Sequence, residues 1–331
     1  MTVSVTRPPV LVLSSSWQGP DTELSFVTRA VAGAASRGGE VTVVTPGPAG
    51  GRVPDGAFDL RGIGKGGEQG WPDPQEAQWD PPPHPGSTWL FDEAGQAALA
   101  LFAAFGGGSP AFSVTPVNGV AVRDVRHMPF VPAPGNGPSE ELGMYVPVNP
   151  LAATYRHGGL GFTGYLLVLT DRPSKPAVTP PTPDAAWLTA RFYRRYVVVI
   201  EGGKAAVWKG RALRGIVGVD TRIDMWRLMA HAWATIDLAP GDIIARECVE
   251  SLRFGTPIVV PSSAAGAAHA RAGGGLTFSG TSELLERVEQ LLDASERERC
   301  SQQGAEYANS RYGDANAFVA GVAKLLELVR G

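Results

Sequence analysis

Short apolar runs and amphipathic stretches alternate along the first part of the chain. Val10–Ser15 is apolar and bounded by polar residues, as is typical of a strand buried in a parallel sheet. From Asp21 to Ser36, apolar residues recur every three or four positions, which predicts an amphipathic helix with Pro20 at its first position. A second apolar run, Glu40–Pro46, follows. This order of strand, helix and strand predicts a βαβ unit.

The following stretch, Gly47–Gly86, has little periodicity and many turn residues, so we expect a surface loop there. Its tryptophans, Trp71 and Trp79, are expected to anchor that loop to the core rather than to stack on a ligand. The pattern then predicts a strand, a helix and a strand, at Thr88–Asp92, Ala94–Phe105 and Ala111–Thr115.

A second alternation of strands and helices begins after Tyr165. The predicted strands are Leu166–Thr170, Val197–Ile200, Ile216–Val219, Thr235–Leu238 and Ile258–Pro261. The predicted helices are Asp184–Tyr196, Ile223–Trp233, Ile243–Phe254, Ser282–Asp293 and Ala315–Val329. This repetition predicts an α/β fold of two Rossmann-like domains with parallel sheets. Because such sheets bind ligands beyond the carboxyl ends of their strands, we expect the two sheets to face a central cleft.

The length of 331 residues also favours two domains over a single core. A glycine-rich, turn-prone stretch at Arg156–Thr163 is the expected boundary. We therefore divide the chain into an N-terminal domain, residues 1–158, and a C-terminal domain that begins at residue 159.

Composition narrows the class of protein. A net charge of −3 gives no overall basic excess for nucleic acid, and we expect at most peripheral contact with a membrane. The two cysteines, Cys248 and Cys300, suggest neither a disulfide framework nor a zinc site. The chain shows no signal-peptide pattern and no apolar run of membrane-spanning length, so we expect a cytoplasmic protein. The bias toward Ala, Gly, Pro and Arg indicates a bacterial source.

Candidate chemistry concentrates in Asp237–Pro261, where a strand and a turn lead into a helix. Asp242 lies at the predicted helix entrance, and Glu250 follows eight residues later, within ~80° of the same face. The backbone amides at this entrance, near Ile243 and Ile244, favour an anion. A helix entrance beside two carboxylates suits a diphosphate that carries hydroxylated sugars.

The run ESLRFGTPIV, residues 250–259, resembles the acidic motif of family-4 retaining glycosyltransferases. In that motif, two glutamates separated by seven residues precede Gly-Thr-Pro and a strand. The resemblance implies that Glu250 holds the ribose hydroxyls and that Asp242, which replaces the first glutamate, contacts the transferred sugar. It covers most of the chain and implies the GT-B fold, in which the C-terminal domain ends at residue 312. The final helix, 313–331, would then cross back to the N-terminal domain.

The resemblance also implies an arginine and a lysine that clamp the diphosphate after the first donor-domain strand. Arg172 and Lys175 are the candidates, and an ordinary solvated turn is the alternative. Gly19 lies between a predicted strand and helix, where it could approach a phosphate or merely allow a turn. Gly202 and Val219 are further candidates on the nucleotide side.

Three other features have simpler interpretations. His127 lies near the position of a histidine common in the family, but a lone histidine is more often structural. His269 could contact the donor sugar or face solvent, and we expect it to face solvent. The glycines of Gly62–Gly67 fit a dinucleotide fingerprint, but they neither follow a convincing strand nor open a helix, which indicates a glycine-rich loop.

The resemblance implies transfer of a sugar from a nucleoside diphosphate to an acceptor hydroxyl, with retention and without a metal or other cofactor. The expected partners are a nucleotide sugar and an acceptor, which could be a sugar, a lipid or a small molecule; the sequence does not specify an oligomeric state. Two alternatives stay open. One is a GT-B-fold binding or scaffold protein with impaired catalysis. The other, ranked third, is a nucleotide-sugar epimerase, which would need a general base in the cleft.

Overall fold

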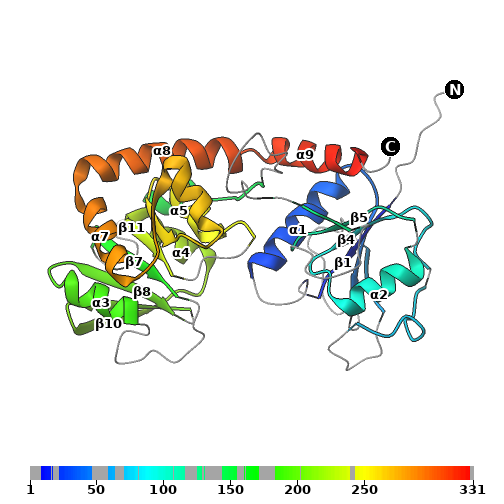
Figure 1. The fold of residues 1–331 in the computed structure, drawn as a ribbon, viewed down its shortest axis with the longest axis horizontal. Coiled ribbons are helices and arrows are strands. Elements are labelled where there is room, and N and C mark those ends of the chain that lie inside the picture. Colours follow the sequence, from blue (N-terminus) through cyan, green and yellow to red (C-terminus); the bar gives the residue numbers. More distant parts are fainter. Residues whose placement is uncertain are drawn as a thin grey trace. The chain divides into compact units, whose positions relative to one another are not determined.

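The computed structural model describes residues 9–15, 17, 22–46, 59–63, 71–80, 82–106, 108–115, 125–128, 130, 144–154, 160, 162–170, 183–201, 203–238 and 243–328. By its internal contacts the chain divides into two compact units (Figure 1). The N-terminal unit is Met1–Met144 together with Ala315–Gly331, and the C-terminal unit is Tyr145–Asp314. The chain thus leaves the N-terminal unit after Met144, earlier than the boundary expected at residue 158.

The sheet of the N-terminal unit is parallel throughout its described strands and has the order β3-β2-β1-β4-β5-β6. These strands are β1 (Val10–Leu13), β2 (Val41–Thr45), β3 (Asp59–Gly62), β4 (Thr88–Phe91), β5 (Ala111–Ser113) and β6 (Val125–His127). Every residue of β1, β2, β4 and β5 is buried, because helices cover both faces of a parallel sheet of this kind. The strand order is that of a doubly wound Rossmann sheet.

The helices of this unit are α1 (Glu23–Ser36), α2 (Gln96–Phe105) and α9 (Ala315–Leu328). Helix α1 begins after Thr22, whose hydroxyl accepts a 3.2 Å hydrogen bond from the Ser25 amide. The helix thus begins at Glu23, and Pro20, which we had predicted at its first position, lies outside the described residues. Helix α9, close to the C-terminus of the sequence, packs on α1 (Figure 1).

The described part of the long loop predicted at Gly47–Gly86 contains one strand, β3, which forms an edge of the sheet. The sequence of β3, Asp-Leu-Arg-Gly, lacks a strand-like apolar pattern, which is why it was missed. Gly62 ends this strand, so the glycine-rich segment does follow a strand, and residues 64–67 lie outside the described part of the chain. Trp71 and Trp79 pack on the core, which confirms their anchoring role.

The sheet of the C-terminal unit has the order β10-β9-β8-β7-β11-β12-β13. Its strands are β7 (Tyr165–Leu169), β8 (Tyr196–Glu201), β9 (Lys204–Lys209), β10 (Ala212–Gly218), β11 (Ala232–Asp237), β12 (Ile258–Pro261) and β13 (Gly275–Phe278). The neighbouring pairs β8–β7, β7–β11, β11–β12 and β12–β13 are parallel. Strands β8, β9 and β10 instead form an antiparallel meander.

This meander adds an antiparallel edge to the mostly parallel sheet that the sequence predicted. Lys204–Lys209 was not predicted as a strand, and the strand predicted at Ile216–Val219 is the end of the antiparallel edge strand β10. Gly203 and Gly210 occupy the two turns with φ of 75° and 59°. Glycine adopts such left-handed angles without strain, so the chain can reverse twice within a few residues.

The helices of this unit are α3 (Pro183–Arg191), α4 (Arg222–His231), α5 (Arg246–Arg253), α6 (Gly266–His269), α7 (Thr281–Leu292) and α8 (Ala294–Tyr312), with a 3₁₀ turn at Pro150–Thr154 and a π turn at Ala270–Gly274. The long helix α8 was not predicted, because it buries only a narrow stripe: Cys300, Gly304, Ala308 and Tyr312. It packs on α5 (Figure 1). None of the helices in the described ranges is long and apolar enough to cross a membrane.

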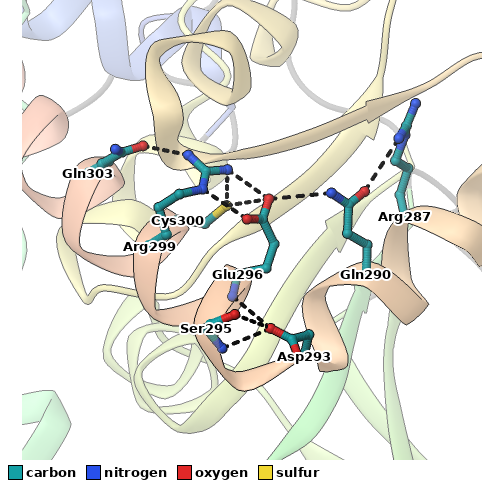
Figure 2. Close-up of polar contacts among 8 residues, drawn as sticks. All are labelled: Arg287, Gln290, Asp293, Ser295, Glu296, Arg299, Cys300 and Gln303. Atoms are coloured by element: carbon teal, nitrogen blue, oxygen red, sulfur yellow. Dashed lines mark hydrogen bonds and ion pairs between the residues drawn. The ribbon is translucent and has the colours of Figure 1, made fainter.

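A network of polar side chains lies at the junction between the end of α7 and the start of α8 (Figure 2). Asp293 caps α8 by accepting hydrogen bonds from the amides of Ser295 and Glu296, at 2.9 and 3.0 Å. Glu296 pairs with Arg299 at 2.9 Å, and Arg299 also donates to Gln303 at 2.6 Å. We call Glu296, Arg299 and Gln303 the α8 surface network.

Candidate functional site

Helix α5 begins later than the sequence predicted. It starts at Arg246, after Ala245, which has left-handed angles of φ 48° and ψ 61° and is the sole non-glycine residue with positive φ among those described. A left-handed residue interrupts a right-handed helix. Ile243 and Ile244 therefore precede α5 and are not part of its first turn, where we had placed them. Asp242 lies outside the described residues.

The carboxylate of Glu250 lies inside a charged cluster between α4 and α5. Its side chain has 0% exposure. Oε1 accepts hydrogen bonds from Nε of Arg222 at 2.9 Å and from Nε of Arg246 at 3.0 Å, and Oε2 accepts one from Nη2 of Arg222. Arg222 also donates through Nη1 to Oε1 of Glu247 at 2.8 Å. We call these two arginines and two glutamates the α4–α5 charge network.

Local sequence explains how the network is placed. Arg246 and Glu250 are four residues apart on α5, so their side chains share one face of the helix. Arg222 is the first residue of α4, and a capping box fixes where that helix begins. In this box the Thr221 hydroxyl accepts from the Asp224 amide at 3.2 Å, and the Asp224 carboxylate accepts from the Thr221 amide at 3.1 Å.

The network is electrostatically balanced. Burial raises the pKa of Glu250, and the positive charges of Arg222 and Arg246 oppose that rise. Burial lowers the pKa of Arg222, but Glu250 and Glu247 raise it above its ordinary value. A buried ionised carboxylate is tolerated in a protein only when it is paired and hydrogen-bonded, and both conditions hold for Glu250.

His269 is buried beneath the start of α5 with 0% exposure, so the expectation that it faces solvent is wrong. Its Nε2 donates to the carbonyl of Ile244 at 2.7 Å, which leaves Nδ1 to accept from the hydroxyl of Tyr307 at 3.0 Å. Burial lowers the pKa of His269 to about 4. A neutral histidine thus holds the carbonyl that precedes the left-handed Ala245.

The Gly-Thr-Pro run after α5 has a clear structural role. Gly255 has a φ of 74° and follows the helix end. Thr256 donates through its hydroxyl to the carbonyl of Met229 at 2.7 Å, which ties this turn to α4. Ser251, on α5, lies 2.6 Å from the Thr235 hydroxyl of β11. These contacts hold α5 against the strand that precedes it and against α4.

Among the predicted site residues, Arg172, Lys175, Asp242, Gly19 and Gly202 all lie outside the described part of the chain. Val219 follows β10, and its amide donates to the carbonyl of Gly203 at 2.8 Å. His127 ends β6 in the N-terminal unit, with an exposed side chain. Within the described ranges, no group of three or more His, Cys, Asp or Glu side chains is placed to hold a metal ion.

Sequence reasoning missed the partners of Glu250. The Arg246–Glu250 spacing in R-E-C-V-E could have been read as a helical ion pair. Nothing in the sequence marks Arg222, because it belongs to another helix, with β11 between the two in the chain.

Comparison with known proteins gives the fold a name. No family model matches the sequence, and no curated protein is significantly similar to it. Among solved structures, Anabaena HepE in complex with UDP and glucose has a TM-score of 0.59 at 13% identity, covering 97% of this chain and 100% of that one. WaaG, a glycosyltransferase involved in lipopolysaccharide biosynthesis, has a TM-score of 0.56 at 13% identity, covering 98% of this chain and 100% of that one. This chain has the GT-B fold.

A third GT-B neighbour is the sucrose-phosphate synthase of Thermosynechococcus elongatus, with a TM-score of 0.57 at 12% identity. It matches over 97% of this chain and 99% of its own. The GT-B match thus spans both units, as the resemblance implied. Identities this low describe the fold and carry no residue roles.

Proposed function

We propose that this protein is a glycosyltransferase that moves a sugar from a nucleoside diphosphate to an acceptor hydroxyl with retention of configuration. The observation that carries the proposal is the GT-B fold over nearly the whole chain, shared with proteins described as glycosyltransferases and with one bound to UDP and glucose. A fold alone supports many functions, so the residues of α5 must supply the rest of the argument.

Helix α5 follows β11, an inner strand of the parallel part of the C-terminal sheet. Ligands of open parallel sheets bind beyond the carboxyl ends of the strands, where such a helix begins. Glu250 is the fifth of the eight residues of α5 and is the residue that matches the ribose-binding glutamate of the acidic motif. In the proposal, Glu250 accepts hydrogen bonds from the ribose hydroxyls of the donor.

The other proposed roles follow from the same resemblance. Asp242 contacts the transferred sugar, and Arg172 with Lys175 neutralises the diphosphate, on which negative charge grows as the glycosidic bond breaks. The resemblance also gives Gly202 and Val219 a role in binding the nucleotide, and Gly19 a role in binding phosphate. In the proposal the transfer needs no metal.

A second candidate is a GT-B-fold protein that binds a ligand without transferring a sugar. One observation favours it: both oxygens of Glu250 already accept hydrogen bonds from arginines, and the side chain has no exposed surface. Such a carboxylate could have become purely structural.

The proposed function is tested by measuring first nucleotide binding and then the release of nucleoside diphosphate from the nucleotide sugar. Wild-type protein is titrated with the diphosphates of uridine, guanosine and adenosine and with their sugars, and binding is followed by the thermal shift and by calorimetry. We expect one base to stabilise the protein, with its sugar form slowly releasing nucleoside diphosphate. Binding without any release or transfer supports the second candidate, and no stabilisation by any of the nucleotides contradicts both.

A matched pair of variants assigns the effect to Glu250. Glu250→Asp keeps the negative charge that the two arginines need but withdraws the carboxylate by one methylene. We expect it to weaken nucleotide binding at least tenfold, the factor that corresponds to about 1.4 kcal/mol. Glu283→Asp alters an ion pair with Arg287 on the exposed side of α7, and it should leave nucleotide binding unchanged.

A further inference from the structure

The two oxygens of Glu250 differ in their partners. Oε1 is shared by Arg222 and Arg246, whereas the sole partner of Oε2 among the described residues is Nη2 of Arg222. The side chain of Arg222 is 22% exposed and that of Arg246 is 7% exposed. Arg222 is therefore the partner with more access to solvent, and its departure would free one carboxylate oxygen completely.

Glu247 offers Arg222 a second carboxylate, 29% exposed, which Nη1 already reaches at 2.8 Å. The network holds two positive and two negative groups, so it can divide into the pairs Arg222–Glu247 and Arg246–Glu250. In that division each carboxylate keeps one guanidinium. No buried charge is left unpaired, which avoids the large penalty of an isolated charge in the interior.

We propose that Arg222 competes with the donor ribose for Glu250 and transfers to Glu247 when a nucleoside diphosphate binds. This inference rests on the proposed function, because it assumes that Glu250 accepts the ribose hydroxyls. Arg222 then sets nucleotide affinity. Molecules in which it holds Oε2 of Glu250 cannot bind the ribose, so the apparent Kd is the intrinsic Kd divided by the fraction of molecules in which Oε2 is free. Glu247 acts as the alternative partner that makes the exchange electrostatically neutral.

Arg222→Met is the first test, because it removes the competing guanidinium and leaves Arg246 to neutralise Glu250. Isothermal titration with UDP, GDP and ADP measures the Kd of wild type and variant. We expect the Kd for the preferred nucleotide to fall about tenfold, as it does when a state holding about nine-tenths of the population is removed. Arg222→Lys keeps the charge but loses the bidentate geometry, so its Kd should lie between those of wild type and Arg222→Met.

Glu247→Gln tests the exchange itself. Without this carboxylate, Arg222 has no second partner in the network and stays on Glu250, so the Kd should rise. In the Arg222→Met background the same substitution should have no effect, and this non-additivity separates an exchange from two independent contacts. Arg227→Met, on the same helix and paired with Asp224, is the matched control and should leave the Kd unchanged.

The possible outcomes separate the two ideas. If wild type binds a nucleotide and Arg222→Met, folded by circular dichroism, binds it equally or more weakly, the competition is wrong and the proposed function stands. If Arg222→Met does not fold, the Kd values of Arg222→Lys and Glu247→Gln test the competition instead. Kd values unchanged from wild type in both variants overturn it. If neither wild type nor any variant binds a nucleotide, the proposed function fails, and the competition fails with it.

Discussion

The α4–α5 charge network and the α8 surface network use the same chemistry in different surroundings. On α8, Glu296 and Arg299 are three residues apart on one helix, and their side chains are 21% and 45% exposed. In the α4–α5 network, Arg222 reaches from one helix to Glu250 on another, and Glu250 has no exposed surface. The first kind of pair lies on a helix face that is exposed to solvent. The second kind is a buried polar arrangement that the fold must place accurately, and such arrangements mark candidate sites.

The largest expected difference is in stability. Glu250→Ala leaves Arg222 and Arg246 without their shared carboxylate and should destabilise the protein by about 3–5 kcal/mol, the usual result of breaking a buried ion pair. Urea unfolding followed by tryptophan fluorescence measures the loss. Glu296→Ala, in the α8 surface network, is the control and should move the urea midpoint only slightly. Equal losses for the two variants would show that burial does not distinguish the networks.

The buried histidine beneath α5 should make stability depend on pH. Unfolded His269 takes up a proton below about pH 6.5, but the folded protein resists protonation until about pH 4, because burial lowers the pKa. The unfolded state therefore binds more protons between these values, and the free energy of unfolding should fall by up to about 3 kcal/mol as pH drops from 6.5 to 4.

The measurement compares wild type with two variants across this pH range. His269→Gln should flatten the slope, because the titrating group is gone. Tyr307→Phe removes the hydroxyl that donates to Nδ1 but keeps the imidazole, so its slope should remain. A wild-type slope that persists in His269→Gln would assign the pH dependence to other groups.

The smallest effect is expected at the exposed end of the comparison. Arg299→Ala removes an ion pair with Glu296 and a hydrogen bond to Gln303, yet it should lower the free energy of unfolding by less than about 1 kcal/mol. Salt should reduce even this difference, because exposed charges are screened. Urea titrations at low salt and at 0.5 M salt check both statements. A salt-independent loss as large as that of Glu250→Ala would contradict the comparison.

Most of the fold could be predicted from apolar patterning. The buried strands β1, β2, β4, β7, β11 and β12 are apolar runs, and α1, α7 and α9 have amphipathic periodicity, so local sequence reports their burial. Two of the missed elements share a cause. β3 is an edge strand with partly polar residues, and α8 buries only a narrow stripe, so the apolar patterns of both are weak.

The site divides in the same way. The sequence alone determined that Glu250 lies on a helix that follows a buried strand and is itself followed by Gly-Thr-Pro. Helix periodicity and turn residues are local properties, so the sequence reports them directly. It could not determine that α5 begins only after a left-handed Ala245, or that His269 lies beneath that turn. Only the tertiary structure decided that Arg222 meets Glu250, because the contact joins residues on separate helices whose packing depends on the whole core of the C-terminal unit.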